Sequence, residues 1–125
     1  MNDRHIVVIA ALTLMVGVGA GAFGAHGLKA MLSADMLAIW QTAVLYQMIH
    51  GLGLLGIAAL AQRLPHRRLI AAGIVMFAGT VIFSGSLYIL ALTGIRGLGA
   101  ITPIGGVAFI VAWAMLALTA WRERQ

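Results

Sequence analysis

Four long stretches without Asp, Glu, Lys or Arg constrain the fold of this chain more than any other feature. They cover residues 6–25, 36–62, 69–95 and 97–121. A helix of about 20 apolar residues crosses the hydrocarbon core of a bilayer, and a backbone in lipid must satisfy its own hydrogen bonds. The sequence therefore predicts an all-α membrane protein. We expect a four-helix transmembrane bundle in one domain over residues 1–125, with spans at about 6–26, 36–62, 69–93 and 102–121.

The composition indicates that these stretches are surrounded by lipid rather than by water. Hydrophobic residues make up 62% of the chain and charged residues only 9%, whereas about a quarter of a soluble domain is charged. The first stretch is longer than the apolar core of a signal peptide, so we expect it to be a retained helix. The basic residues lie in short connections, which favours membrane lipids as partners and argues against nucleic acid.

Lys and Arg are distributed unequally between the two sides of the predicted bundle. One side carries Arg4, Arg63, Arg67, Arg68, Arg122 and Arg124, and the other carries Lys29 and Arg96. The positive-inside rule then places both termini in the cytoplasm, with the protein in the cell inner (plasma) membrane. Leu28, Met31 and Leu32 share a helical face, so we expect a short surface segment between the first and second helices.

Local signals predict several helix ends. Ser33 is a suitable N-cap for the second helix, Gly94 a suitable stop for the third, and Thr102 a suitable start for the fourth. Trp40 and Trp121 fall near opposite ends of the predicted spans, where aromatic belts lie at membrane interfaces.

The chain has 16 glycines, and small residues allow helices in lipid to approach closely. Those expected at helix contacts are Gly17, Gly21, Gly24, Gly85, Gly105 and Gly106, of which Gly17 and Gly21 form a GxxxG pair. Two interpretations remain open for them: packing within one bundle, or contact between copies in a homo-oligomer.

Polar side chains inside the spans are the candidate functional residues, because such groups are costly in lipid and usually face the bundle interior. They are His26, Tyr46, Gln47, His50, Ser84, Ser86, Tyr88 and Thr102. We expect one polar cluster in the outer half of the membrane. It would tie helices together, bind a small ligand, a lipid headgroup or a proton, or carry out catalysis. No span contains Asp or Glu and the chain has no Cys, so we expect no catalytic residues, metal site or cofactor.

Several motifs together resemble one small membrane protein family. They are residues 21–28 (GAFGAHGL), Tyr46 and Gln47 with His50, residues 83–88 (FSGSLY), residues 102–106 (TPIGG) and Trp113. The combination is similar to the family that includes the bacterial YgdD inner-membrane proteins and the animal proteins called transmembrane protein 256. This resemblance implies a multi-pass membrane protein, marks the polar residues named above as candidates, and implies no activity.

Our functional expectation is an integral inner-membrane protein of unknown biochemical activity that is not an enzyme. We expect a binding or accessory subunit that acts through its polar cluster, with lipids, a second copy or another membrane protein as partner. The alternative is a small homo-oligomeric transporter-like or channel-like protein for a small solute, lipid or proton.

Overall fold

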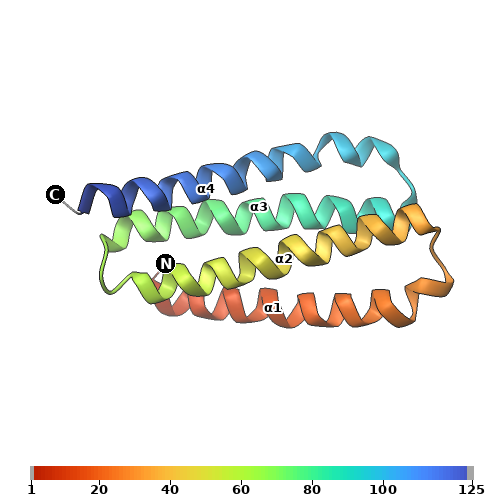
Figure 1. Cartoon of the computed structure of the whole chain (residues 1–125), viewed down its shortest axis with the longest axis horizontal. Coiled ribbons are helices and arrows are strands. Elements are labelled where there is room, and N and C mark those ends of the chain that lie inside the picture. Colours follow the sequence, from red (N-terminus) through yellow and green to blue (C-terminus); the bar gives the residue numbers. More distant parts are fainter. Residues whose placement is uncertain (1, 124–125) are drawn as a thin grey trace.

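The structure, a computed structural model, describes residues 2–123 and contains four long helices in this range. They are α1 (Asp3–His26), α2 (Ala34–Leu60), α3 (His66–Thr93) and α4 (Thr102–Glu123), and each runs antiparallel to the next (Figure 1). Two 3-10 turns, η1 (Leu28–Ala30) and η2 (Arg96–Ala100), lie in the connections at one end. All four long helices are long and apolar enough to cross a membrane, and no strand occurs among the described residues. The predicted fold class is confirmed.

The helix ends follow the local signals in the sequence. The Ser33 side chain accepts a hydrogen bond from the backbone N–H of Met36 and so caps α2. Gly94 ends α3 in the left-handed conformation, with φ of 73°, which glycine adopts without the strain that a Cβ atom would bring. Thr102 is the first residue of α4. Both ends of the chain lie at the end of the bundle opposite η1 and η2 (Figure 1). Arg124, assigned from sequence to the same side, lies outside the described residues.

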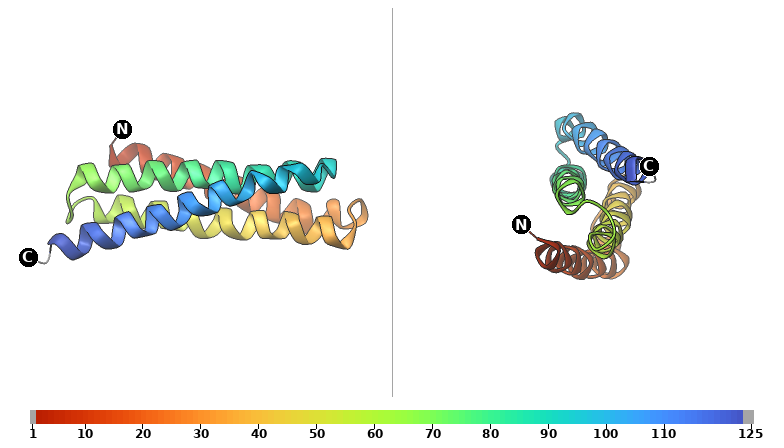
Figure 2. Two further views of the ribbon diagram at one scale, coloured as in Figure 1. Left: turned by 90° about the horizontal axis from the view of Figure 1, so that it is seen from above. Right: turned by 90° about the vertical axis from the view of Figure 1, so that its left-hand side faces the viewer.

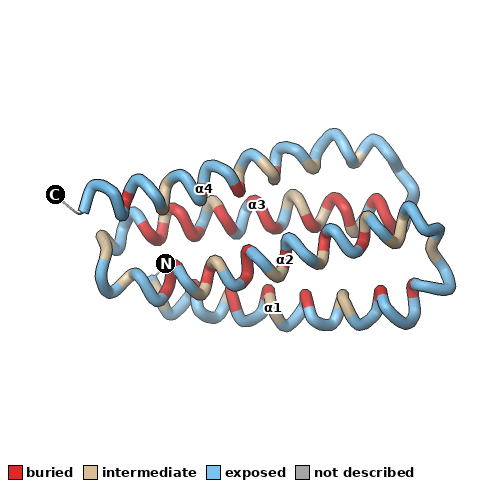
Figure 3. Tube along the Cα trace, viewed as in Figure 1, coloured by how far each residue is buried: buried red, intermediate tan, exposed pale blue. Residues whose placement is uncertain are grey.

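The helices do not form a square bundle. α2 packs on α1 and on α3, α3 packs on α4, and α1 and α4 lie at opposite sides of the central α2–α3 pair (Figure 2). Buried residues accordingly concentrate on α3 and on the inner face of α2, while α1 and α4 expose most of their length (Figure 3). This arrangement leaves one furrow lined mainly by residues of α1 and α3, and another lined mainly by residues of α2 and α4.

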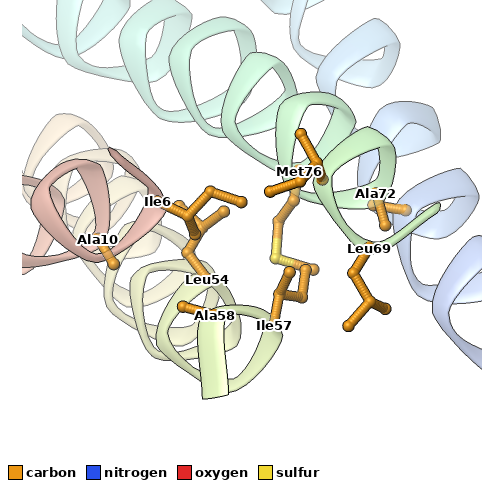
Figure 4. Packing of buried hydrophobic residues seen from close by; sticks show 10 residues of the cluster. Ile6, Ala10, Leu54, Ile57, Ala58, Leu69, Ala72 and Met76 are labelled. Atoms are coloured by element: carbon orange, nitrogen blue, oxygen red, sulfur yellow. The ribbon is translucent and has the colours of Figure 1, made fainter. Parts of the chain in front are cut away.

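The largest apolar core lies at the end of the bundle that holds the chain termini. Ile6 of α1, Leu54 and Ile57 of α2, and Leu69 and Met76 of α3 are each at most 1% exposed there (Figure 4). Side chains from three helices interlock in this core, and Ala112 of α4 closes it. No charged residue belongs to it.

A smaller core at the opposite end corrects two expectations from the sequence. Leu28 does not share an exposed face with Met31; it is 1% exposed and packs with Trp40 and Ala91, while Met31 is exposed. Trp40 is also buried rather than placed at a lipid interface. Its indole N–H donates to the backbone oxygen of Ala20 at 2.9 Å, and this bond compensates for burying a polar atom.

The glycines expected at helix contacts lie on α1, α3 and α4, and they differ in how closely the neighbouring helix approaches them. A Cβ atom on Gly17 or Gly24 would lie within 2.7 Å of a side chain of α2, and one on Gly21 would lie 3.3 Å from Val44. The GxxxG face of α1 is therefore used for packing within this chain. Gly105 meets the backbone of α3, whereas Gly106 makes only ordinary contact and Gly85 has no described neighbour that a Cβ atom would touch.

Candidate functional site

The two furrows of the bundle contain recesses with different chemical linings. The recess between α1 and α3 has a volume of about 380 Å³, and Gln47 of α2 and Tyr88 of α3 line it together with apolar residues. The recess between α2 and α4 has a volume of about 680 Å³ and is lined by several rings. We call the second recess the aromatic groove and define it by Tyr46, His50, Phe83, Phe109 and Trp113.

Gln47 connects three helices beside the first recess. Its side-chain amide donates to the backbone oxygen of Thr13 in α1 at 2.9 Å, and its side-chain oxygen accepts from the Tyr88 hydroxyl of α3 at 2.5 Å. The ring of Trp40 packs on Tyr88, with 4.5 Å between ring centroids. We call Gln47, Tyr88 and the Thr13 carbonyl the Gln47 network. Its hydrogen-bonding atoms are directed at protein partners, which suits a structural tie in lipid.

His50 is held by hydrogen bonds at both ring nitrogens. Its Nδ1 lies 2.8 Å from the backbone oxygen of Tyr46, and its Nε2 accepts from the indole N–H of Trp113 at 3.0 Å. Indole is only a donor, and a backbone carbonyl is only an acceptor. The hydrogen-bond pattern therefore assigns the proton to Nδ1 and makes the ring a neutral imidazole that joins α2 to α4.

Three of the five rings that define the aromatic groove, Tyr46, His50 and Phe109, lie nearly parallel. His50 stacks on Phe109 at 3.5 Å between centroids and 7° between planes, and Tyr46 is inclined by 13° to His50 and by 19° to Phe109. Phe83 packs on both Tyr46 and Phe109. His50 and Phe109 are each 4% exposed, so they form the buried floor of the groove, whereas Tyr46 at 36% and Trp113 at 40% expose ring surface against which another planar ring can pack.

The Tyr46 hydroxyl differs from the other polar groups in the two recesses. It forms no hydrogen bond with any residue of the described range 2–123, although the side chain is 36% exposed along the groove. In the α1–α3 recess, by contrast, Thr13, Thr80 and Ser84 each donate to a backbone oxygen. The aromatic groove is thus the recess that offers a polar atom to a bound molecule.

The eight polar residues expected to form one cluster fall into separate hydrogen-bonded groups. Gln47 and Tyr88 belong to one group, and Tyr46 and His50 to the aromatic groove. Ser86 is paired with Thr102 at 2.6 Å, and Ser84 donates to the backbone oxygen of Ala43 at 2.7 Å. His26 is exposed at the end of α1 and makes no hydrogen bond or ring contact within the described range.

Helix geometry explains this division. Adjacent residues on a helix point about 100° apart, so Tyr46 and Gln47 face different neighbours although they are consecutive. Tyr46 and His50, four residues apart, share the side of α2 that faces α4. Gln47 instead faces Thr13 of α1 and Tyr88 of α3, to both of which it is hydrogen-bonded.

Four residues of the site were not among the polar candidates: Thr13, Phe83, Phe109 and Trp113, of which Phe83 and Trp113 belong to the motifs that carry the family resemblance. Thr13 contributes a backbone oxygen, which no side-chain pattern can reveal. Phe109 and Trp113 are four residues apart in the middle of α4, and a Trp so far from either helix end was an available signal. No group of three His, Cys, Asp or Glu side chains within residues 2–123 could hold a metal ion.

Comparison with known proteins identifies the family. A family model described as "Protein of unknown function (DUF423)" matches residues 20–106. The chain belongs to the DUF423 family. The expectation from the motifs, a small membrane protein family without an assigned activity, is confirmed. The DUF423 match includes Tyr46 and His50 and ends before Phe109 and Trp113.

Relatives of this DUF423 chain are named membrane proteins. It is 53% identical over 115 residues to the UPF0382 membrane protein SSP2132 of Staphylococcus saprophyticus, which covers 92% of this chain and 95% of the relative. It is 50% identical over 118 residues to the UPF0382 membrane protein YwdK of Bacillus subtilis, with 94% and 96% covered. No solved structure matches the DUF423 chain. The protein is an integral membrane protein of an uncharacterised family.

Proposed function

We propose that this protein is a non-enzymatic binding protein of the inner membrane that holds a planar, lipid-soluble molecule in the aromatic groove. The ligand class is a flat ring with a carbonyl or hydroxyl oxygen, as in quinones. The observation that carries this proposal is the hydroxyl of Tyr46, a residue that lines the groove, because this hydroxyl has no hydrogen-bond partner among residues 2–123. A hydroxyl in hydrocarbon without a partner is unfavourable, so a bound oxygen atom would stabilise it.

The depth of Tyr46 supports a lipid-soluble ligand rather than a headgroup. Tyr46 lies near the middle of α2 (Ala34–Leu60), and at a rise of about 1.5 Å per residue it is roughly 18 Å along the helix axis from Ala34. The phosphate of a lipid does not reach that depth. A ring that dissolves in the hydrocarbon core does, and the exposed ring surfaces of Tyr46 and Trp113 can pack against it.

The hydrogen bonds of His50 favour a structural role in the groove over a role in proton transfer. Both of its ring nitrogens are committed to bonds that also position Trp113 and the groove backbone. A transporter-like or channel-like protein would also need a polar path through the bundle. The core at the end that holds the termini consists instead of Ile6, Leu54, Ile57 and other apolar residues. We therefore prefer binding to conduction.

The tyrosines provide a matched test of this binding site, because the chain has two of them. We expect Tyr46→Phe to weaken binding of decylubiquinone to the protein in detergent micelles by about three- to tenfold, the loss of one net hydrogen bond. Tyr88→Phe removes the same atom from the α1–α3 side and should leave the dissociation constant unchanged. Isothermal titration calorimetry measures both. Equal binding by the wild type and Tyr46→Phe, or no saturable binding by the wild type, would contradict the proposal.

We also propose that both termini and the α2–α3 connection face the cytoplasm. The support is the excess of Arg at that end, at positions 63, 67, 68 and 122, over Lys29 and Arg96 at the other. The chain has no Cys, so single Cys variants report topology without further changes. In intact cells, a membrane-impermeant maleimide should label Gly97→Cys and leave Gln62→Cys unlabelled until the cells are lysed. The reverse pattern would overturn this orientation.

A further inference from the structure

A third recess lies at the end of the bundle that holds the chain termini, between α3 and α4. Its volume is about 230 Å³. Its lining residues are Arg68, Ala71, Met115, Leu118, Thr119 and Arg122. None of them belongs to the aromatic groove. The recess is therefore independent of the function proposed above.

The recess has a cationic mouth and an apolar wall. Arg68 lies in the first turn of α3 and Arg122 in the last turn of α4, and these antiparallel helices bring the two residues to the same end. Ala71, Met115 and Leu118 line the same recess and lie farther from these helix ends than the arginines do. Thr119 donates its hydroxyl to the backbone oxygen of Met115 at 2.7 Å and so adds no free donor.

The positive charge at this mouth is not compensated within the described residues. Within residues 2–123, neither Arg68 nor Arg122 forms an ion pair with Asp3, Asp35 or Glu123, which carry the side-chain carboxylates of the sequence. The first turn of α3 contains no acidic residue, and no side chain caps it, because Pro65 occupies the N-cap position. The free N–H groups of that turn add to the positive potential.

We propose that this recess binds an anionic phospholipid, with its phosphate between Arg68 and Arg122 and an acyl chain along Met115 and Leu118. Guanidinium groups bind phosphate oxygens in a bidentate manner, and two of them on separate helices suit one phosphodiester. The apolar residues directly below the arginines favour a lipid over a free phosphate ion, since a free ion would make no use of them.

The test compares two pairs of arginine substitutions that remove the same charge at the same end. Arg68→Gln with Arg122→Gln alters the recess, and Arg63→Gln with Arg67→Gln alters two exposed arginines outside it. The probes are phosphatidylglycerol and phosphatidylcholine with identical acyl chains, and native mass spectrometry of the detergent-solubilised protein measures their dissociation constants. Thermal unfolding of each variant confirms that it is folded.

We expect the wild type to bind phosphatidylglycerol about tenfold more tightly than phosphatidylcholine, the scale of one charge-assisted hydrogen bond. The Arg68/Arg122 double variant should lose this preference, and the Arg63/Arg67 double variant should keep it. An equal loss in both pairs would show diffuse attraction and overturn the site. Displacement of phosphatidylglycerol by an excess of inorganic phosphate would identify a free-anion site and overturn the lipid as its ligand.

Discussion

Gly105→Ala is expected to lower the free energy of unfolding by about 3 kcal/mol, the upper part of the range for overpacking. A Cβ atom at this position would lie 2.5 Å from the backbone nitrogen and 2.8 Å from the Cα atom of Phe83. Backbone atoms in the middle of a helix cannot rotate away as a flexible side chain can. The methyl group must therefore separate α3 from α4, and the separation weakens the wall between Phe83 and Phe109 as well.

Gly19→Ala is the matched control for this change. Gly19 lies in the interior of α1, and a Cβ atom there meets nothing within 4 Å. Alanine has the higher helix propensity by about 1 kcal/mol, so this variant should unfold at the same temperature as the wild type or slightly above it. Thermal unfolding followed by circular dichroism in one detergent measures both variants. If Gly105→Ala is as stable as Gly19→Ala, α3 and α4 do not touch at Gly105.

Gln47→Leu is expected to lower the free energy of unfolding by about 1–3 kcal/mol, the cost of leaving a polar group without its partner. The substitution removes the donor to Thr13 and the acceptor of the Tyr88 hydroxyl, and Gln47 is only 6% exposed. Leucine fills a similar volume, so the loss reports the hydrogen bonds rather than a cavity.

Two further variants separate this effect from the mere loss of a polar side chain. Gln41 is exposed on the same helix and makes no hydrogen bond within the described range, so Gln41→Leu should leave stability unchanged. Tyr88→Phe removes the hydroxyl that Gln47→Leu leaves without an acceptor. The double variant Gln47→Leu with Tyr88→Phe should therefore be more stable than Gln47→Leu alone, as measured by the same thermal unfolding. An additive loss in the double variant would show that the two side chains do not interact.

The fold could be predicted from the sequence because its main determinants are local. Charge-free stretches of sufficient length specify the four helices, and single residues such as Ser33, Gly94 and Thr102 mark where helices begin or end. Predicting that the helices lie in a membrane requires no knowledge of how they pack. It requires only that apolar side chains outnumber charged ones.

The arrangement of the site could not be predicted in the same way, since it depends on the rotation of each helix about its axis. A rotation by one residue decides whether Gln47 or Tyr46 faces α4. The buried position of Trp40 follows from Gly24, whose missing side chain leaves room for the indole. Such pairings join residues far apart in the sequence, and neither partner alone reveals the contact.

The central claim is that the aromatic groove between α2 and α4 binds a ligand. An experimental density map tests this claim most directly. We would determine the structure of the protein in lipid nanodiscs, with and without decylubiquinone. We expect planar density in the groove, with an oxygen within hydrogen-bond distance of the Tyr46 hydroxyl. Ring density in the α1–α3 recess instead, or identical maps with and without the probe, would contradict it.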